Sequence, residues 1–200
     1  MREYRGLRYD VDADVYEPSD DSFLLVDAVM DQALEGRRVL EIGCGAGLAS
    51  IAAARGGASV VAVDKNPRAT RLARENARRN ETSVGVVRGD LLTALRGSFD
   101  LLLFNPPYLP SVPADEPRGR ADLDDAWAGG TTGLDVVNRL FDQLADRRVV
   151  VRELLLVTSS LQDESAIAAR LEALGYAGAR LRDQKFAWER LTVWKWALRR

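Results

Sequence analysis

The strongest chemical signal in the chain is the tetrapeptide Asn105-Pro106-Pro107-Tyr108, which follows directly on the apolar run at 101–104. Both prolines have a fixed φ, and Pro107 also restricts the residue before it, so the turn is stiff. The Asn105 oxygen and the Pro106 carbonyl can each accept one proton of a planar NH2 group, and the Tyr108 ring offers a flat face. The pattern predicts a socket for an amide or amino nitrogen. The competing interpretation is a rigid exit turn in which the tyrosine is ordinary packing.

A second signal lies upstream, where the segment Val39–Gly47 runs from a predicted strand into a tight loop that opens a helix. Its glycines, Gly43, Gly45 and Gly47, permit backbone angles closed to other residues and let a ligand approach the main chain. The spacing is G-x-G-x-G, whereas dinucleotide enzymes use G-x-G-x-x-G with a pyrophosphate at the helix start. Glu41 precedes the loop, where its carboxylate would repel a pyrophosphate but suits the ammonium and sulfonium of S-adenosylmethionine (SAM). The loop therefore favours SAM over a nicotinamide cofactor.

Two further carboxylates end predicted strands. Asp64 closes the next strand, where an acidic side chain can accept both ribose hydroxyls of a nucleoside. Asp90 closes the third strand and precedes Leu91-Leu92, a polar tip beside an apolar wall that suits an adenine amino group and its ring. Any one of these carboxylates is explained equally well as a helix cap or a loop charge. Together with Glu41, at three successive strand ends, they predict one cofactor pocket.

The elements that position these residues alternate from residue 38 onward between short β-rich runs and amphipathic stretches. This alternation is typical of an α/β fold with helices on both faces of a mostly parallel sheet. Seven strands are predicted, at 38–42, 59–64, 83–87, 99–104, 153–158, 179–183 and 191–198. The last two have no helical pattern between them, so we expect an antiparallel hairpin, and the final strand is apolar on both faces and should lie inside the sheet. A helix is predicted to begin with Asn66 as its cap and Pro67 as its first residue.

Composition limits the remaining possibilities. Two hundred residues with 46% hydrophobic content suffice for one sizeable core, so we expect a single domain over 1–200, with 1–36 as an N-terminal extension and helix. The 28 basic and 30 acidic residues give a net charge of −2, which disfavours duplex nucleic acid as a partner. The N-terminus contains no apolar signal region, and no run is long enough to cross a bilayer. We therefore expect a cytoplasmic protein that does not bind membranes.

Cys44 is the only cysteine and the chain contains no histidine. An internal disulfide is therefore excluded, and the usual zinc and imidazole chemistries are absent, so no metal is expected. Cys44 is interpreted as a small loop residue, since a catalytic thiol would lack a histidine base.

With these residues in place, the chain resembles the class I SAM-dependent methyltransferases. Within them it resembles the HemK-like glutamine methyltransferases, which modify the Gly-Gly-Gln loop of translation release factors. The archaeal and eukaryotic branch is the sharper match: its start resembles Val15-Tyr16-Glu17-Pro18-Ser19-Asp20-Asp21-Ser22-Phe23-Leu24-Leu25, and a later loop resembles Ala126–Gly130 followed by Gly133. The resemblance covers nearly the whole chain from about Val15.

The resemblance implies a seven-stranded Rossmann-like sheet with an antiparallel C-terminal hairpin, and SAM as the cofactor. By position, it implies that the cofactor is lined by Ser22, Glu41, Gly43, Asp64, Asp90, Leu91 and Asn105, to which the glycine loop adds Gly45 and Gly47. It further implies that residues 105–108 hold the glutamine, that a translation release factor is the protein substrate, and that the partner is a small zinc-binding activator subunit. The N-terminal extension would contribute to the cofactor pocket.

Three alternatives remain open. A nucleic-acid methyltransferase can use the same tetrapeptide on adenine or guanine, but the near-neutral charge and the lack of room for a target-recognition domain disfavour it. A protein-lysine methyltransferase must first remove a proton from an ammonium, which this socket does not assist. A non-catalytic SAM-fold subunit has no need of all four side chains at positions 41, 64, 90 and 105. The acidic stretch 109–128 is predicted to be either a substrate-binding lid or a disordered loop.

Overall fold

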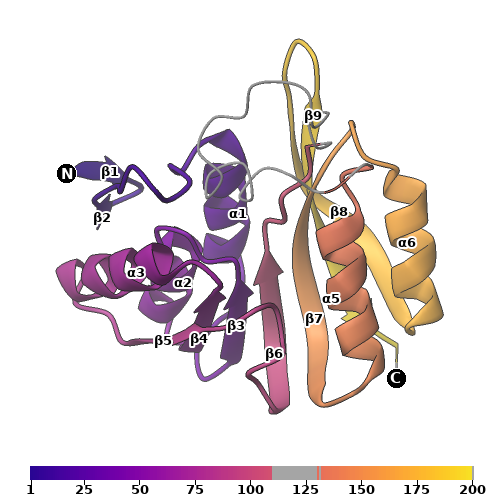
Figure 1. Ribbon diagram of the computed structural model, residues 1–200, viewed down its shortest axis with the longest axis horizontal. Helices are drawn as coiled ribbons and strands as arrows, with labels where there is room; N and C mark the ends of the chain where they lie inside the picture. The colour runs from indigo at the N-terminus through magenta and orange to yellow at the C-terminus, as the bar shows by residue number, and fades with distance from the viewer. Residues whose placement is uncertain (110–129, 131, 200) are drawn as a thin grey trace.

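The computed structural model describes residues 1–109, 130 and 132–199, and its centre is a seven-stranded sheet. The parallel strands are β3 (Arg38–Ile42), β4 (Ser59–Asp64), β5 (Val84–Arg88), β6 (Gly97–Phe104) and β7 (Val149–Ser159). Two antiparallel strands complete it, β8 (Tyr176–Lys185) and β9 (Arg190–Leu198). The strand order β5-β4-β3-β6-β7-β9-β8 places the final strand inside the sheet. The predicted fold class and the C-terminal hairpin are therefore confirmed (Figure 1).

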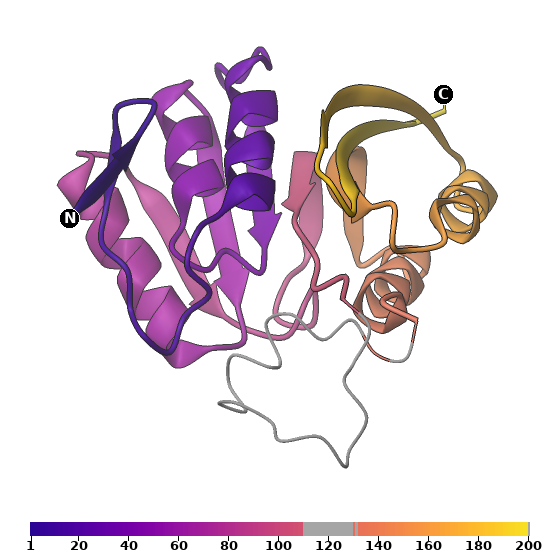
Figure 2. The ribbon, with the colours of Figure 1, turned by 90° about the horizontal axis from the view of Figure 1, so that it is seen from above.

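Helices cover both faces of this sheet. One face carries α1 (Asp20–Met30), α2 (Leu48–Arg55) and α3 (Pro67–Arg79), and the other carries α5 (Asp135–Ala145) and α6 (Glu164–Ala173). Helices α2 and α3 lie over the half of the sheet that contains β3 to β5 (Figures 1 and 2), whereas α1 packs beside α2 and contacts β7, β8 and β9. Strand β6 serves both layers, because Leu101 and Leu103 pack on one side while Leu102 and Phe104 pack on the other. A strand buried on both faces explains the continuous apolar run in the sequence.

Helix α3 begins as the sequence predicts. The Asn66 side chain accepts a hydrogen bond from the Arg68 backbone N at 2.9 Å, and Pro67 is the first helical residue. Its apolar face is buried, namely Ala69, Leu72, Ala73 and Ala77. Two asparagines are also buried, Asn76 within the helix and Asn80 at its C-cap.

An N-terminal hairpin that the sequence analysis did not predict packs beside these helices. It consists of β1 (Arg2–Tyr4) and β2 (Leu7–Tyr9), which pair in antiparallel fashion. Tyr4 stacks on Phe23 of α1 with ring centroids 4.2 Å apart. Leu7 is fully buried in the core layer formed by the first three helices. The hairpin is therefore part of the packed structure.

The two buried asparagines of α3 hold this hairpin through its main chain. Asn80 Oδ1 accepts from the Arg8 backbone N, and Asn76 Oδ1 accepts from the Asp10 backbone N, each at 2.9 Å. The Asn76 amide also donates to the Ala46 carbonyl at 2.9 Å. One side chain therefore ties the N-terminal segment to the glycine loop.

The direction in which the chain winds reverses between β3 and β6, which are neighbours in the sheet. Ile42 pairs with Phe104, so the glycine loop and residues 105–108 leave the sheet from adjacent strands, which lie about 4.8 Å apart. We call residues 105–108 the proline corner. In open α/β sheets, ligands bind at the carboxyl ends of the strands at such a switch point.

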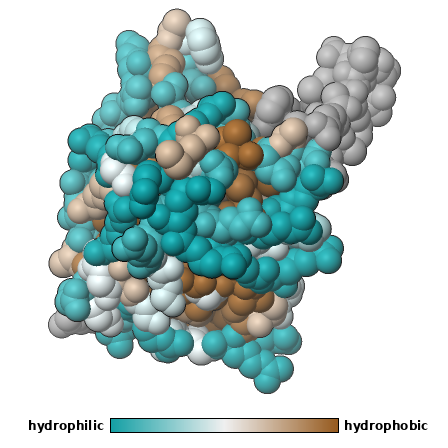
Figure 3. Space-filling model, turned by 90° about the vertical axis from the view of Figure 1, so that its left-hand side faces the viewer, coloured by the Kyte–Doolittle hydropathy of each residue, from teal (hydrophilic) through white to brown (hydrophobic). Residues whose placement is uncertain are grey.

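The face that carries the β1–β2 hairpin and α3 is mainly hydrophilic, and hydrophobic residues show in patches between the polar ones (Figure 3). In the part of the chain that the structure describes, no helix combines the length and the apolar character needed to span a bilayer.

Candidate active site

A cavity of about 410 Å³ lies at the switch point of the sheet, within the range of roughly 300–1,000 Å³ typical of small-molecule sites. Its wall is built by the N-terminal segment, the glycine loop, the ends of β4, β5 and β6, and α5. Every residue predicted for the cofactor or the acceptor lines it: Ser22, Glu41, Gly43, Gly45, Gly47, Asp64, Asp90, Leu91, Asn105, Pro106, Pro107 and Tyr108. The fold therefore brings all of the sequence-predicted residues to one place.

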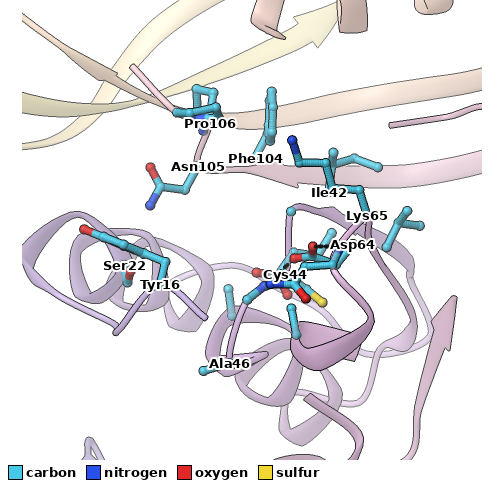
Figure 4. A pocket seen from close by; sticks show the side chains of 18 of the residues that line it. Tyr16, Ser22, Ile42, Cys44, Ala46, Asp64, Lys65, Phe104, Asn105 and Pro106 are labelled. Atoms are coloured by element: carbon cyan, nitrogen blue, oxygen red, sulfur yellow. Dashed lines mark hydrogen bonds between the residues drawn. The ribbon is translucent and has the colours of Figure 1, made fainter. Parts of the chain in front are cut away.

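The side chains divide the cavity into two parts. Asn105 points from the end of β6 toward the region where Tyr16 and Ser22 lie, and we call this part the corner side (Figure 4). Asp64 and Cys44 lie on the wall formed by the glycine loop and β4, which we call the loop side.

The glycine loop has the backbone conformation that its sequence predicts. Gly43, Gly45 and Gly47 all have positive φ, at 65°, 51° and 82°. At Gly47 a Cβ atom would lie 3.0 Å from the Ala73 Cβ and 3.2 Å from the Ala73 Cα. The absence of a side chain at this position lets α2 begin directly against α3.

Glu41 is buried and binds the first turn of α2. Its Oε2 accepts from the Ser50 backbone N at 2.8 Å and from the Ser50 hydroxyl. This carboxylate satisfies helix donors that the N-cap residue, a glycine, cannot satisfy. Burial raises the pKa of the Glu41 carboxyl to about 7, against the effect of the Ser50 hydrogen bonds and with a further rise from Asp64. Glu41 thus has a structural role besides the predicted one, and a cation in the cavity would favour its charged form.

Asp64 orders both the loop and the start of α3. One carboxylate oxygen accepts from the Gly45 backbone N and the other from the Asn66 backbone N, each at 2.9 Å. Burial raises the pKa of Asp64, and these hydrogen bonds act against that rise. Each carboxylate oxygen has a second lone pair, so the side chain retains the capacity to accept hydroxyl groups.

Asp90 was predicted to accept from an adenine amino group. In the structure its carboxylate is paired with Arg139 of α5. This pairing joins residues 49 positions apart, which the local sequence does not reveal. Leu91 and Leu92 are buried, and Leu91 lines the cavity as the predicted apolar wall. Leu91 also has a φ of 52°, a left-handed conformation that costs a residue with a side chain roughly 1–2 kcal/mol.

The proline corner presents a buried acceptor without a partner. Asn105 Oδ1 is inaccessible to solvent, and none of the described residues donates a hydrogen bond to it. An unpaired buried polar atom of this kind costs about 1–3 kcal/mol. Asn105 and Pro106 both line the cavity, and rotation of the Asn105 amide about its broad terminal torsion would present this oxygen to a ligand that donates an N–H there.

Two residues that line the corner side, Tyr16 and Asp21, were not predicted as site residues. Asp21 is 4% exposed and accepts from the Tyr16 hydroxyl at 3.1 Å and from the Ser22 backbone N at 2.6 Å. Burial raises the pKa of Tyr108, and the charge of Asp21 adds to the rise. The Tyr108 hydroxyl therefore stays neutral. The burial of Asp21 could not be predicted, because an acidic residue at the start of a helix usually indicates only a favourable charge in the first turn.

Gly133 fixes the end of the proline corner. A Cβ at this position would lie 2.3 Å from the Tyr108 carbonyl oxygen, and its φ of 71° is itself a glycine conformation. The Gly133 carbonyl accepts from Gln162 Nε2 at 2.6 Å. The preceding motif residues 126–129 and the predicted lid, apart from Leu109, lie outside the described residues.

The chain is similar to known proteins over most of its length. The family model for the methyltransferase small domain matches residues 18–115. A protein of Methanocaldococcus jannaschii, named as a candidate protein N5-glutamine methyltransferase, is 37% identical over 175 residues, which cover 87% of each chain. Methyltransferase HEMK2 of Mus musculus is 37% identical over 193 residues, covering 90% of this chain and 88% of its own.

A solved structure is similar over the same extent. It is a chain of the E. cuniculi Mtq2–Trm112 complex, described as responsible for methylation of the eRF1 translation termination factor. The two chains are 30% identical with a TM-score of 0.74, and the match covers 93% of this chain and 99% of that one. The residues matched by the family model, 18–115, include residues of both the loop side and the corner side of the cavity. The chain therefore belongs to the archaeal and eukaryotic branch of the HemK-like family of class I SAM-dependent methyltransferases.

Proposed function

We propose that this enzyme transfers the methyl group of SAM to the side-chain amide of the glutamine in the Gly-Gly-Gln motif of a translation release factor. The observation that carries the proposal is the buried, unpaired Asn105 Oδ1 in a stiff corner of the cavity wall. The proposal is supported by the name of the M. jannaschii relative and by the described activity of the E. cuniculi complex. The whole of 1–200 would act as one domain, with 1–36 contributing to the cofactor pocket.

The loop side of the cavity fits SAM. Glu41 and Asp64 provide negative charge for a cationic ligand, and the glycine loop exposes main chain to it. We assign cofactor binding to Ser22, Glu41, Gly43, Gly45, Gly47, Asp64, Asp90, Leu91 and Asn105. Asp64 would accept ribose hydroxyls through its remaining lone pairs, and Leu91 would contact the adenine ring. When bound, SAM supplies a methyl group on a positively charged sulfur.

The proline corner would act by placing the acceptor nitrogen. An amide nitrogen is a poor nucleophile because its lone pair is delocalised, and the chain contains no histidine to act as a base. In the proposed arrangement, Asn105 Oδ1 and the Pro106 carbonyl accept the two N–H groups and fix the direction of the nitrogen. The same oxygens stabilise the positive charge that develops on it. The proton then leaves to water or to a carbonyl.

The test is mass spectrometry after incubation with labelled SAM and separate acceptors: a release factor, tRNA, ribosomal RNA and DNA. We expect label on the glutamine of the Gly-Gly-Gln motif, and none on a release factor in which that glutamine is replaced by alanine. Label on nucleic acid or on lysine would contradict the proposal in favour of the corresponding alternative. Failure to bind SAM in calorimetry, alone and with a partner, would indicate a non-catalytic subunit.

We also propose a small activator subunit as a partner, and a cytoplasmic location. The partner is supported by the E. cuniculi relative, whose structure is that of a complex with Trm112. The zinc-binding character of the subunit rests on the family resemblance alone. Methylation rates measured with and without a co-expressed partner test this part of the proposal, and equal rates would contradict it.

Replacement of Tyr108 tests the contact with the acceptor. We expect Tyr108→Ala to raise the KM for the release factor about tenfold and to lower kcat, because aromatic contacts contribute about 0.5–1.5 kcal/mol beyond simple burial. Tyr108→Phe keeps the ring and should keep the KM. Since Tyr108 also packs against the core, thermal unfolding of both variants is recorded alongside steady-state kinetics. An unchanged KM in the alanine variant would argue against stacking.

The pKa of Glu41 predicts a pH-dependent affinity. Because the carboxyl has a pKa of about 7 in the cofactor-free protein, SAM affinity should rise as pH increases through this value and Glu41 becomes charged. Stability should change in the opposite direction. The pKa of Glu41 in the folded protein lies above the ordinary value of 4.5. Its contribution to the free energy of unfolding is therefore fully present below pH 4.5 and is lost as pH rises through about 7.

Calorimetry with SAM and thermal unfolding, both across this pH range, measure the two effects. The matched control is Glu41→Gln, which keeps an acceptor oxygen for Ser50 but cannot ionise. A wild-type affinity profile that parallels that of the glutamine variant would refute the assigned role of Glu41.

A further inference from the structure

Exposed hydrophobic side chains gather around the proline corner. Eight large hydrophobic residues are exposed in the described part of the chain, and three of them are Leu109, Leu161 and Trp188. Trp188 is 76% exposed. Single exposed hydrophobic residues are normal in proteins, but several beside an active site indicate a binding surface.

Main-chain and side-chain contacts place the first two of these residues at the corner. Leu109 follows Tyr108 directly in the chain. Leu161 lies in the turn after β7, beside Gln162, whose side chain donates to the Gly133 carbonyl. Gly133 in turn abuts the Tyr108 carbonyl. The turn that carries Leu161 therefore borders the corner side of the cavity.

Trp188 belongs to the tip of the β8–β9 hairpin, which lies against the same turn. The Ser160 backbone N donates to the Arg190 carbonyl at 2.9 Å, and the Ser159 hydroxyl donates to Glu189 Oε2 at 2.7 Å. The charge of Glu189 is among the causes that raise the pKa of Tyr108, so the tip is close to the corner. Figure 1 shows the hairpin tip at the end of the molecule where the chain leaves β6.

The hairpin tip is closed by a main-chain hydrogen bond. The Phe186 backbone N donates to the Glu189 carbonyl at 2.7 Å, and the Phe186 side chain packs against the core layer beneath. Trp188 is thus held outward by a fixed turn, and a rigid aromatic side chain loses little entropy when a partner covers it.

We propose that Leu109, Leu161 and Trp188, which we call the apolar rim, form the docking surface for the acceptor protein. This inference rests on the proposed function. The two glycines before the target glutamine have no side chains, so contacts that hold the acceptor must come from residues beyond them. Three residues of extended chain span about 10 Å, which takes those contacts out of the cavity and onto its rim. Trp188 is the residue type that most often dominates such contacts.

The charges around the rim favour a protein surface over a nucleic acid. Arg190 pairs with Glu164 at 3.6 Å, and Glu189 lies one residue from Trp188. The rim is therefore apolar with both signs of charge at its edge, whereas a phosphate backbone requires a predominantly basic surface.

The experiment compares Trp188→Ala with wild type, using the complex with the activator subunit where activity requires it. We expect the KM for intact release factor to rise about tenfold, as for an interface hot spot, with kcat and SAM affinity unchanged. A short peptide that contains only Gly-Gly-Gln and its nearest neighbours should be methylated equally well by both. Trp188→Phe should lose less than threefold. Val150→Ala is the matched control, because Val150 is exposed at the opposite end of β7.

Four outcomes are decisive. An unchanged KM for the intact acceptor would overturn the docking surface, and an equal loss with the short peptide would show that Trp188 acts on the corner instead. A wild-type dimer that Trp188→Ala converts to a monomer would identify a second copy of the chain as the occupant. Calorimetric binding of intact release factor, measured without turnover, distinguishes failure of this inference from failure of the proposed function. If the wild-type enzyme binds the release factor but methylates an atom other than the glutamine amide nitrogen, only the proposed function is contradicted.

Discussion

Asn105→Ala is expected to reduce kcat for glutamine methylation about 100- to 1,000-fold, the range measured when one charge-stabilising hydrogen-bond partner is removed from an active site. Asn105 Oδ1 is buried without a partner in the described residues, so in the proposed reaction its free lone pairs hold the acceptor N–H. Alanine removes that acceptor and leaves the carboxylates of the loop side in place. SAM affinity should therefore fall only modestly. Single-turnover methylation and calorimetry measure the two quantities separately.

Asn138→Ala provides a matched control on α5, outside the cavity wall. It removes the same side chain from a site where the contact is a long hydrogen bond of 3.4 Å with Arg170, and it should leave kcat unchanged. Full activity of Asn105→Ala would eliminate the proposed pair of acceptors. A large loss of SAM affinity in that variant would show that Asn105 serves mainly the cofactor.

Gly133→Ala is expected to reduce kcat about 100-fold by moving the proline corner. The new Cβ would lie 2.3 Å from the Tyr108 carbonyl oxygen, a main-chain atom that can yield only by shifting the corner itself. A displacement of about 1 Å in acceptor position is sufficient for a loss of this size. Because the cofactor carboxylates lie on other segments, SAM affinity should change little. Rapid-quench measurement of the transfer step and calorimetry test both statements.

Gly97→Ala separates this effect from backbone strain. Gly97 also has a positive φ, 105°, but a Cβ there would meet nothing within 4 Å. Both variants incur the left-handed penalty of roughly 1–2 kcal/mol, which lowers the Tm by about 2–4 °C per kcal/mol in a domain of this size. Only Gly133→Ala should lose activity beyond this stability effect. Equal activities in the two variants would rule out the role assigned to the contact with Tyr108.

The sheet was largely predictable because each central strand carries its own signal. The apolar run before the proline corner indicates a strand buried on both faces, and the register of β3 with β6 confirms it. The Asn66-Pro67 start of α3 was predictable for the same reason, since capping depends on neighbouring residues. Strand ends were less accurate: β7 begins at Val149 instead of 153. The pairing of Gly97 with Val149, and of Ser98 with Val150, extends both strands, and such pairing is a tertiary effect.

The N-terminal hairpin could not be predicted because its partners are distant. Arg8 and Asp10 donate main-chain hydrogen bonds to Asn80 and Asn76, 72 and 66 residues away. No local pattern in strands of 3 residues specifies such contacts. The two asparagines look like ordinary polar positions on an Arg-rich helix until the hairpin covers them.

The same distinction applies to the candidate site. Residue type and spacing located Glu41, Asp64 and Asn105, because each lies at or next to the carboxyl end of a strand, where ligands bind in such sheets. Asp21 and Arg139 were missed, since Asp21 is buried by the fold and accepts from the Tyr16 hydroxyl, and Arg139 reaches Asp90 from a separate helix. Burial and long-range pairing determine these roles, and neither is encoded within a short stretch of sequence.

Because Ile42 pairs with Phe104, the loop side and the corner side of the cavity are attached to neighbouring strands. Under the proposed function, the interval between methyl donor and acceptor is then set by the main-chain ladder, about 4.8 Å wide. Substitutions on the hairpin tip or the outer turns leave that interval untouched. Recognition of new target proteins can therefore evolve at the surface while the reaction coordinate stays constant.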